Sequence, residues 1–348
     1  MTSAGPDPRS EVRPDATVGE VGEEAILAAI FPLLPAGAAT LLGPGDDAAV
    51  VAAPDARFVV STDVLVEDRH FRRAWSTGYD VGWRAAVQNL ADVAAMGATP
   101  TSLVVSLVVP SDLPVAFVTG LARGLAAACE PVGAAVVGGD LSGAEQVVVA
   151  VTVHGDLDGR DPVTRAGARP GDVVAHAGRR GWSAAGLALA TAGRASCALP
   201  AAEQDPLTAA YLRPDPPLGA GVAAALAGAT SMLDVSDGLL RDAGRVARAS
   251  DVRIDLDLAS FAADAAALVG AARDLRSGPV RALVDEWILT GGEDHGLLAT
   301  FGPDAVLPEG FRVVGTVLAS DGAPRVTVNG SAPAVAGTGW DHFGGSSR

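Results

Sequence analysis

Five short acidic motifs lie at the ends of apolar segments in this 348-residue chain, and a sixth carboxylate, Asp92, stands in an Ala-rich segment. The motifs are Gly45-Asp46-Asp47, Ser61-Thr62-Asp63, Gly138-Gly139-Asp140, Asp234-Val235-Ser236-Asp237-Gly238 and Gly291-Gly292-Glu293-Asp294. Carboxylates are the ligands that hard cations such as Mg²⁺ prefer, and glycines let the backbone approach a ligand closely. The motifs therefore predict a site that binds metal ions.

The chain contains no lysine. A P-loop needs a lysine on the transferring phosphates, so this class of nucleotide site is excluded. Two like charges about 4 Å apart repel by roughly 4 kcal/mol at an effective dielectric near 20. A cluster of aspartates therefore needs cations, or its pKa values rise. We predict that any phosphate chemistry here depends on metal ions held by aspartate.

Each candidate residue also has a purely structural interpretation. An aspartate after a glycine is most often a turn residue, but six such carboxylates in one chain favour a shared function. Arg165 is either a phosphate contact or a surface arginine paired with an aspartate. Ser236 either caps the helix that follows it or binds a phosphate at the helix N-terminus. By pattern alone, His70 is a polar residue whose hydrogen bonds are made within the protein, and Trp340 packs against a hydrophobic edge of the fold.

The composition excludes several classes of partner. A formal net charge of −16 argues against binding to nucleic acid or to anionic membranes, because such a surface repels polyanions. The longest uncharged stretches, residues 93–111 and 216–233, are broken by Gly and Pro, so neither predicts a membrane span. Cys129 and Cys197 are predicted to be buried small hydrophobes, which fits a reducing cytoplasm.

The positions of Pro, Gly and charge suggest where domains begin and end. Residues 1–17 are rich in Pro and charge and lack an apolar segment, which predicts a disordered tail and no signal peptide. Residues 155–172 are dense in Gly, Asp, Arg and Pro, which predicts a domain boundary. Because 348 residues exceed one ordinary core, we expect two domains, at 18–157 and 158–348.

Strands and helices alternate in both predicted domains, which indicates an α/β class. In the first, strands are expected at 57–66, 103–109, 134–137 and 147–153, and helices at 80–97 and 115–130. In the second, strands are expected at 172–176, 232–235, 287–290, 311–318 and 325–328. One helix is expected to start at Ser183, and another to run from the turn at 234–238 to about Ser250. Ligands of α/β sheets gather at the carboxyl ends of strands, so we expect the acidic motifs to converge.

Taken in order, these motifs resemble the thiamine-monophosphate kinase family. This family belongs to a superfamily that includes aminoimidazole ribonucleotide synthetase and selenophosphate synthetase. The resemblance runs from about Gly45 to Phe343. Its most specific blocks are Ala94-Ala95-Met96-Gly97, residues 164–172 (TRAGARPGD), Ser236-Asp237-Gly238-Leu239 and Gly339-Trp340-Asp341-His342-Phe343.

The resemblance implies two α/β domains (α+β type) of the aminoimidazole ribonucleotide synthetase-like fold, with the N-terminal domains pairing through their sheets into a homodimer. It also implies a cytoplasmic enzyme that phosphorylates thiamine monophosphate to thiamine diphosphate with ATP, by in-line transfer assisted by several Mg²⁺ ions. The acceptor phosphate is ionised near pH 7, so no general base is needed. Metal ions would relieve the repulsion between the two anions.

The resemblance further implies roles for individual residues. Metal ligands would be Asp47, Ser61, Thr62, Asp63, Asp92, Asp140, Asp234 and Asp237, and the catalytic ones among them Asp92, Asp140 and Asp234. ATP contacts would be Gly139, Asp140, Arg165 and Ser236. The thiamine monophosphate pocket would be lined by His70, by Glu293 through its charge and by Trp340 through stacking on the cationic rings.

The chain departs from the family pattern at Leu141, where Thr is common, and at His295-Gly296, where Tyr-Glu is common. Three alternatives to the implied function stay open. Another superfamily activity is one, although selenophosphate synthetase carries a reactive Cys near its N-terminus and the first Cys here is Cys129. A two-metal phosphohydrolase is the second and would release inorganic phosphate. A cation-binding protein is the third, but its regular ligand period does not appear.

Overall fold

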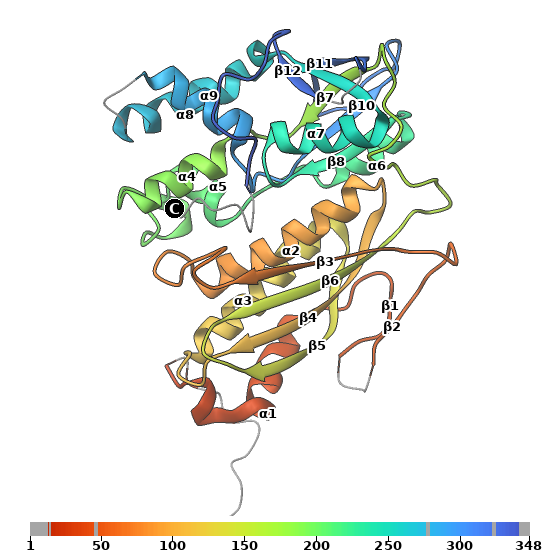
Figure 1. Ribbon diagram of the computed structural model, residues 1–348. Coiled ribbons are helices and arrows are strands. Elements are labelled where there is room, and N and C mark those ends of the chain that lie inside the picture. Colours follow the sequence, from red (N-terminus) through yellow and green to blue (C-terminus); the bar gives the residue numbers. More distant parts are fainter. Residues whose placement is uncertain (1–12, 14, 45–47, 276–278, 322–324, 341–348) are drawn as a thin grey trace, which may run out of the picture. The chain divides into compact units, whose positions relative to one another are not determined.

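The computed structural model of the protein describes residues 13, 15–44, 48–275, 279–321 and 325–340 (Figure 1). It separates into two compact units. The first unit comprises the described residues of Met1–Asn89 and Pro100–Asp156, and the second those of Leu90–Thr99 and Leu157–Arg348. The chain first passes from one unit to the other inside helix α2 (Gly78–Ala95).

The sheet of the first unit has the strand order β3-β6-β4-β5. The strands are β3 (Val59–Val66), β4 (Thr99–Val109), β5 (Ala135–Gly143) and β6 (Val148–Asp156). β3 runs antiparallel to β6, whereas β4 and β5 are parallel. Side chains alternate between the two faces, so Leu65 is buried while Val60 and Val64 are 55% and 44% exposed. One face of this sheet lies in the core and the other is open.

Helices α2 and α3 (Val115–Cys129) lie along the covered face of this sheet (Figure 1). Two glycines allow close approach of their backbones. A Cβ on Gly82 would lie 2.0 Å from Leu121 O, and one on Gly124 would lie 2.1 Å from Tyr79 O. A larger residue at either position would push the helices apart. The remaining elements are α1 (Val18–Ile30), η1 (Phe31–Leu33), β1 (Thr40–Leu42), β2 (Val50–Val51) and η2 (Glu130–Val132).

The segment Val115–Val132 is long and apolar enough to cross a membrane by length and composition, and no other helix among the described residues is. Half of this segment is buried inside the protein. Its buried side chains include Val118, Leu121 and Leu125 of α3. Such burial is typical of the core helix of a folded domain.

The sheet of the second unit has the strand order β12-β9-β11-β7-β10-β8. Its strands are β7 (Val173–Ala177), β8 (Ser231–Val235), β9 (Val252–Leu256), β10 (Gly296–Phe301), β11 (Phe311–Ala319) and β12 (Val326–Val328). Neighbouring strands are antiparallel, apart from the parallel pair β12 and β9. Gly296 lies opposite Val235, and Leu297 opposite Asp234. The start of β10 therefore lies beside the end of β8.

Helices and short 3-10 segments complete the second unit. They are α4 (Trp182–Thr191), η3 (Ala201–Glu203), α5 (Pro206–Leu212), α6 (Gly219–Leu226), α7 (Leu239–Ser250), η4 (Leu258–Phe261), α8 (Ala262–Leu275) and α9 (Val280–Thr290). Their apolar side chains form a core with the sheet, including Leu233, Leu239, Leu268, Ile288 and Leu298.

The expected strand at residues 287–290 is wrong. These residues end helix α9, in which Val284, Trp287 and Ile288 are buried at helical spacing. The Gly291-Gly292-Glu293-Asp294 motif therefore follows a helix and precedes strand β10. Because β10 is antiparallel to β8, the start of β10 still comes beside the end of β8, where the other acidic motif lies.

Two further motifs lie inside strands and not after them. Ser61-Thr62-Asp63 is in the middle of β3, and Gly138-Gly139-Asp140 is within β5. Most of the predicted tail, residues 1–12 and 14, lies outside the described residues. Its end is packed: Ala16 is 4% exposed, and its carbonyl accepts a hydrogen bond from Val115 N at 2.8 Å.

Candidate active site

Acidic residues gather at the end of β8 in the second unit. Asp234 lies on β8 and is 6% exposed, and Asp237 follows in the turn before α7. Asp234 Oδ2 lies 3.2 Å from His295 Nδ1. The antiparallel register explains this contact, because His295 directly precedes Gly296, the residue opposite Val235.

Two arginines of α7 contact Asp237. Arg245 Nη2 lies 2.5 Å and Arg241 Nε 3.8 Å from Asp237 Oδ2. Arg245 Nη1 also lies 2.5 Å from Asp242 Oδ1. Asp242 is fully buried, and its Oδ2 accepts hydrogen bonds from the backbone N–H groups of Asp237 at 3.0 Å and Gly238 at 3.1 Å. Asp242 thus fixes the turn that carries the predicted metal ligands.

The pKa of Asp242 is raised by its surroundings. Burial raises the pKa of its carboxyl to about 6, and the attraction of Arg245 is opposed by the charges of Asp234 and Asp237. The carboxylates are therefore close enough to repel one another. A bound cation would relieve this repulsion.

The loop that carries Glu293 packs on Ser236. Glu293 N donates to Ser236 O at 2.8 Å, and a Cβ on Gly292 would lie 2.4 Å from the same oxygen. Glu293 and His295 have φ angles of 68° and 52°. Left-handed conformations of non-glycine residues cost about 1–3 kcal/mol and cluster at functional sites. Helix α7 has Gly238 at its N-cap, so Ser236 is not its capping residue.

Asp294, the last residue of the same motif, has a structural role. Its carboxylate accepts hydrogen bonds from Gly181 N at 2.6 Å and Ser183 N at 2.8 Å, at the start of α4. The fully buried Arg180 lies 3.4 Å away through Nη1, and its Nη2 donates to Gly291 O at 2.6 Å. Asp294 thus stabilises the N-terminus of α4 and the loop beside the site.

The C-terminal segment also reaches this turn. Trp340 N donates to Asp237 O at 2.8 Å, and the side chain is 39% exposed. A Cβ on Gly339 would lie 2.2 Å from the same carbonyl, so the segment runs close against the turn. Asp341, His342 and Phe343 lie outside the described residues. The predicted residues that the structure brings together in this unit are Asp234, Ser236, Asp237, Glu293 and Trp340.

Arg165 lies at the opposite end of α7 from this cluster. Its carbonyl accepts from Ser250 Oγ at 2.9 Å, and Ser250 is the last residue of α7. The helix has 12 residues and is therefore about 18 Å long. The backbone of Arg165 is thus not brought beside Ser236, which precedes the first turn of α7.

In the first unit, Ser61, Thr62 and Asp63 occupy successive positions of β3. Alternation places the side chains of Ser61 and Asp63 on the covered face and that of Thr62 on the open face. Thr62 Oγ1 donates to Val151 O at 2.9 Å and accepts from Thr152 Oγ1 at 3.2 Å. The three side chains therefore do not point to one place, against what a shared ligand set requires.

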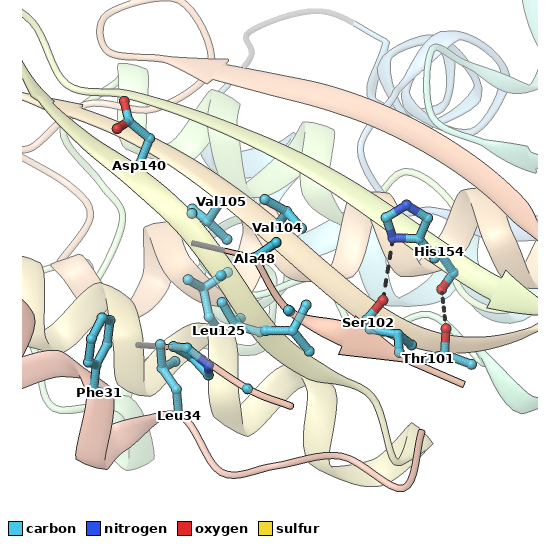
Figure 2. Close-up of a pocket in the computed structure, with 18 of the residues that line it drawn as sticks. Phe31, Leu34, Ala48, Thr101, Ser102, Val104, Val105, Leu125, Asp140 and His154 are labelled. Atoms are coloured by element: carbon cyan, nitrogen blue, oxygen red, sulfur yellow. Dashed lines mark hydrogen bonds between the residues drawn. The ribbon is translucent and has the colours of Figure 1, made fainter. Parts of the chain in front are cut away.

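Gly139 and Asp140 border a pocket of about 870 Å³ in the first unit. Its lining is mainly apolar and includes Phe31, Leu34 and Leu125 (Figure 2). A Cβ on Gly139 would lie 2.0 Å from Val105 O, so this position admits no side chain. Asp140 is exposed and accepts from Ser142 Oγ at 3.2 Å. Asp140 and His154 lie at opposite ends of the labelled residues (Figure 2).

The strand order separates two predicted metal ligands of this unit. Asp63 lies on β3 and Asp140 on β5, the two edge strands of the sheet. Two strands stand between them, which corresponds to about 14 Å at the usual strand spacing. Within one chain, the sheet does not place these carboxylates on a common cation.

The remaining predicted residues have local partners or lie outside the described part. His70 Nδ1 accepts from Val66 N at 2.9 Å at the end of β3. Asp92 is half-buried on α2, one turn beyond Asn89, whose Oδ1 accepts from Asp63 N at 3.1 Å. Asp47 lies outside the described residues.

Sequence reasoning missed three residues of this region: Arg180, Asp242 and Arg245. Asp242 and Arg245 stand three positions apart on a helix, a spacing typical of ion pairs, so this pair could have been recognised. Arg180 contacts Asp294 across 114 positions of sequence, and no local pattern indicates that contact.

The arrangement fits Mg²⁺ held jointly with phosphate. Among the described residues, no group of three or more His, Cys, Asp or Glu side chains could hold a metal ion. Mg²⁺ is usually bound through one or two carboxylates together with substrate phosphates and water. Asp234 and Asp237, three positions apart at the end of β8, offer such a partial donor set.

The fold and these motifs define a class of protein. Residues 45–157 match the family described as AIR synthase related protein, N-terminal domain. A solved structure of AaThiL complexed with AMPPCP and TMP superposes with a TM-score of 0.71 at 31% identity, covering 86% of this chain and 91% of that one. The protein therefore has the aminoimidazole ribonucleotide synthetase-like fold expected from its motifs.

The relatives narrow the class to a family. Thiamine-monophosphate kinase of Mycobacterium tuberculosis is 47% identical over 329 residues, which cover 94% of this chain and 93% of the relative. The enzyme of the same name from Corynebacterium glutamicum is 42% identical over 342 residues, covering 95% and 96%. The chain belongs to the thiamine-monophosphate kinase family.

Proposed function

We propose that this enzyme transfers the terminal phosphate of ATP to thiamine monophosphate, giving thiamine diphosphate and ADP. The observation that carries the proposal is the 47% identity over 94% of the chain to a thiamine-monophosphate kinase. The AaThiL structure, complexed with AMPPCP and TMP, supports ATP and thiamine monophosphate as the two substrates. The gathering of Asp234, Asp237 and Glu293 at one edge of the second sheet is consistent with it.

The chemistry requires two anions to approach each other. Mg²⁺, when bound, would neutralise phosphate charge and orient the transferring group. Asp234 and Asp237 offer carboxylate oxygens at the end of β8, and Asp242 and Arg245 hold the turn on which Asp237 lies. The acceptor is an ionised phosphate oxygen, so these residues position and neutralise and do not abstract a proton.

We propose the following roles. Asp92, Asp140 and Asp234 are catalytic carboxylates, and the metal ligands are Asp47, Ser61, Thr62, Asp63, Asp92, Asp140, Asp234 and Asp237. Thr62 contributes through its backbone oxygen, because its hydroxyl is bonded within the open face of the sheet. Gly139, Asp140, Arg165 and Ser236 contact ATP, and the apolar pocket beside Gly139 supports a nucleoside there.

Glu293 and Trp340 are proposed to recognise the cationic thiamine rings. Glu293 is held against Ser236, and Trp340 against Asp237, through backbone hydrogen bonds of 2.8 Å. Both residues are partly exposed, at 37% for the Glu293 side chain and 39% for Trp340. His70 of the first unit is also proposed to contact thiamine monophosphate; its Nδ1 accepts from Val66 N.

The proposal extends to the organisation of the chain. The proposed domains are residues 18–157 and 158–348. The proposed location is the cytoplasm, and the proposed assembly is a homodimer formed through the first sheet. The open face of that sheet exposes Val60, Val64 and Val104 at 55%, 44% and 36%, and such a patch suits a partner. A second copy would cover it.

A product assay tests the proposed function. The purified protein is incubated with ATP, Mg²⁺ and thiamine monophosphate, and the products are separated by chromatography. We expect thiamine diphosphate and ADP in equal amounts and no product without Mg²⁺. Release of inorganic phosphate without thiamine diphosphate would instead support a two-metal phosphohydrolase.

A further inference from the structure

We propose that His295 is a positioning residue that holds the carboxylate of Asp234 in its metal-binding orientation. The proposal rests on the proposed function, in which Asp234 is a metal ligand. It assigns a purpose to a residue at which this chain departs from its family pattern.

The contact is a buried hydrogen bond between two strand ends. His295 Nδ1 lies 3.2 Å from Asp234 Oδ2, and the two residues are 3% and 6% exposed. An ionised carboxylate only accepts, so the hydrogen bond requires a proton on Nδ1. One oxygen of Asp234 is thereby engaged by the ring, and the orientation of the other is set with it.

The loop before β10 is built to deliver this ring. His295 has φ of 52° and Glu293 φ of 68°, conformations that L residues rarely adopt. Between them, Asp294 is tied to Gly181 N and Ser183 N at the start of α4. Glu293 N is tied to Ser236 O at 2.8 Å. These contacts hold the backbone before His295, and the pairing of Gly296 with Val235 holds it after His295, so the ring starts from a fixed place beside Asp234.

The same ring links the two proposed parts of the site. His295 Nε2 lies 4.0 Å from Glu293 Oε2, while Nδ1 faces Asp234. Carboxylates that bind metals are commonly held by a second hydrogen-bonded group, and loss of such a partner typically weakens metal binding by 10- to 100-fold. We therefore expect His295 to affect metal affinity first and thiamine monophosphate affinity second.

Three substitutions separate positioning from packing. His295→Leu removes the hydrogen bond and fills the buried position with an apolar side chain. His295→Asn keeps an N–H donor close to the place of Nδ1. Thr327→Val is the matched control, because it removes a 2.6 Å hydrogen bond to the carboxylate of Asp255 on β9, away from the end of β8.

The primary readout is Mn²⁺ binding to the purified protein in the presence of the ATP analogue AMPPCP, followed by electron paramagnetic resonance. Asp234→Asn shows which part of the binding depends on Asp234. We expect His295→Leu to raise the Kd of that part about 10- to 100-fold, His295→Asn to restore it to within about threefold, and Thr327→Val to leave it unchanged. In the Asp234→Asn background, His295→Leu should have no further effect.

Other outcomes overturn the proposal in distinguishable ways. An unchanged Mn²⁺ Kd in His295→Leu, with a lowered Tm in both backgrounds, would make His295 a packing residue and leave the proposed function intact. Identical Mn²⁺ binding by wild type and Asp234→Asn would show that Asp234 is not a metal ligand, and it would overturn the proposal. Failure of the kinase assay alone, with Mn²⁺ binding as expected, would count against the proposed substrates only.

Discussion

Arg245 holds Asp237 through an ion pair in which Nη2 and Oδ2 are 2.5 Å apart. The same guanidinium reaches the buried Asp242 through its other nitrogen, Nη1. One arginine thus balances two carboxylates at the turn where a metal ion is proposed to bind. A cation arriving at Asp237 would share it with this arginine.

Arg245→Gln should lower the free energy of unfolding by about 1–3 kcal/mol, because it leaves Asp242 buried without its cation. Added Mg²⁺ should recover part of this loss if it binds Asp237. The control is Arg281→Gln, which removes an i,i+4 helix pair between the exposed Arg281 and the partly buried Asp285 and should cost about 0.5 kcal/mol. Urea unfolding with and without Mg²⁺ measures both, and equal losses in the two variants would contradict the role given to Arg245.

Asp242 predicts a pH dependence of stability. Its pKa in the folded protein is about 6, above the ordinary value of 3.8. The folded state therefore binds this proton more tightly than the unfolded state, a contribution that is complete below about pH 4 and lost as the pH rises through about 6. Relative to Asp242→Asn, wild type should lose on the order of 3 kcal/mol of stability across this window. Unfolding curves at half-unit steps test it, and a constant difference would refute it.

Asp140→Asn should reduce turnover at least about 100-fold and leave the fold intact, because Asp140 is exposed and its proposed role is in the site alone. Asp92→Asn should behave likewise, with a larger effect on stability because Asp92 is half-buried on α2. Glu145→Gln, a change at an exposed acid after β5, is the control. Circular dichroism and ADP release are measured together. Near-normal turnover in both aspartate variants would rule out the metal site as proposed.

The open face of the first sheet predicts a dimer. Val60→Glu with Val64→Glu should give a monomer, because two charges would enter the proposed interface at positions that are 55% and 44% exposed in one chain. Val306→Glu, at an exposed position of the second unit, should leave the dimer intact. Light scattering at micromolar concentration measures the oligomeric state of wild type and both variants. A monomeric wild type would remove the claim.

Trp340→Ala should raise the KM for thiamine monophosphate roughly two- to thirtyfold and change the KM for ATP little. The reason is the loss of a stacking or cation–π contact worth about 0.5–2 kcal/mol. Trp340→Phe should restore most of the affinity. If Trp340 only packs the C-terminal segment against Asp237, the variant would show a lower Tm and unchanged KM values for both substrates.

The strands and helices that carry a clear apolar period were predictable. The strands expected at 57–66 and 232–235 are found as β3 (Val59–Val66) and β8 (Ser231–Val235). The apolar residues 287–290 belong to a helix, because a short apolar run does not distinguish a strand from a helix. The hydrogen bond between Glu293 and Ser236 depends on the antiparallel pairing of β8 and β10. The sequence of a strand does not indicate which other strand it pairs with. For the same reason, the separation of Asp63 from Asp140 on opposite edges was not predictable.

Neighbouring residues of the Gly291-Gly292-Glu293-Asp294 motif do different work. Asp294 stabilises the N-terminus of α4, while Glu293 is partly exposed beside the proposed substrate. A mutational scan scored by growth would register losses at both positions and make them look alike. Lower temperature should rescue substitutions at Asp294, whose defect is in folding, and should not rescue those at Glu293. Such temperature sensitivity would divide one continuous motif into a structural half and a functional half.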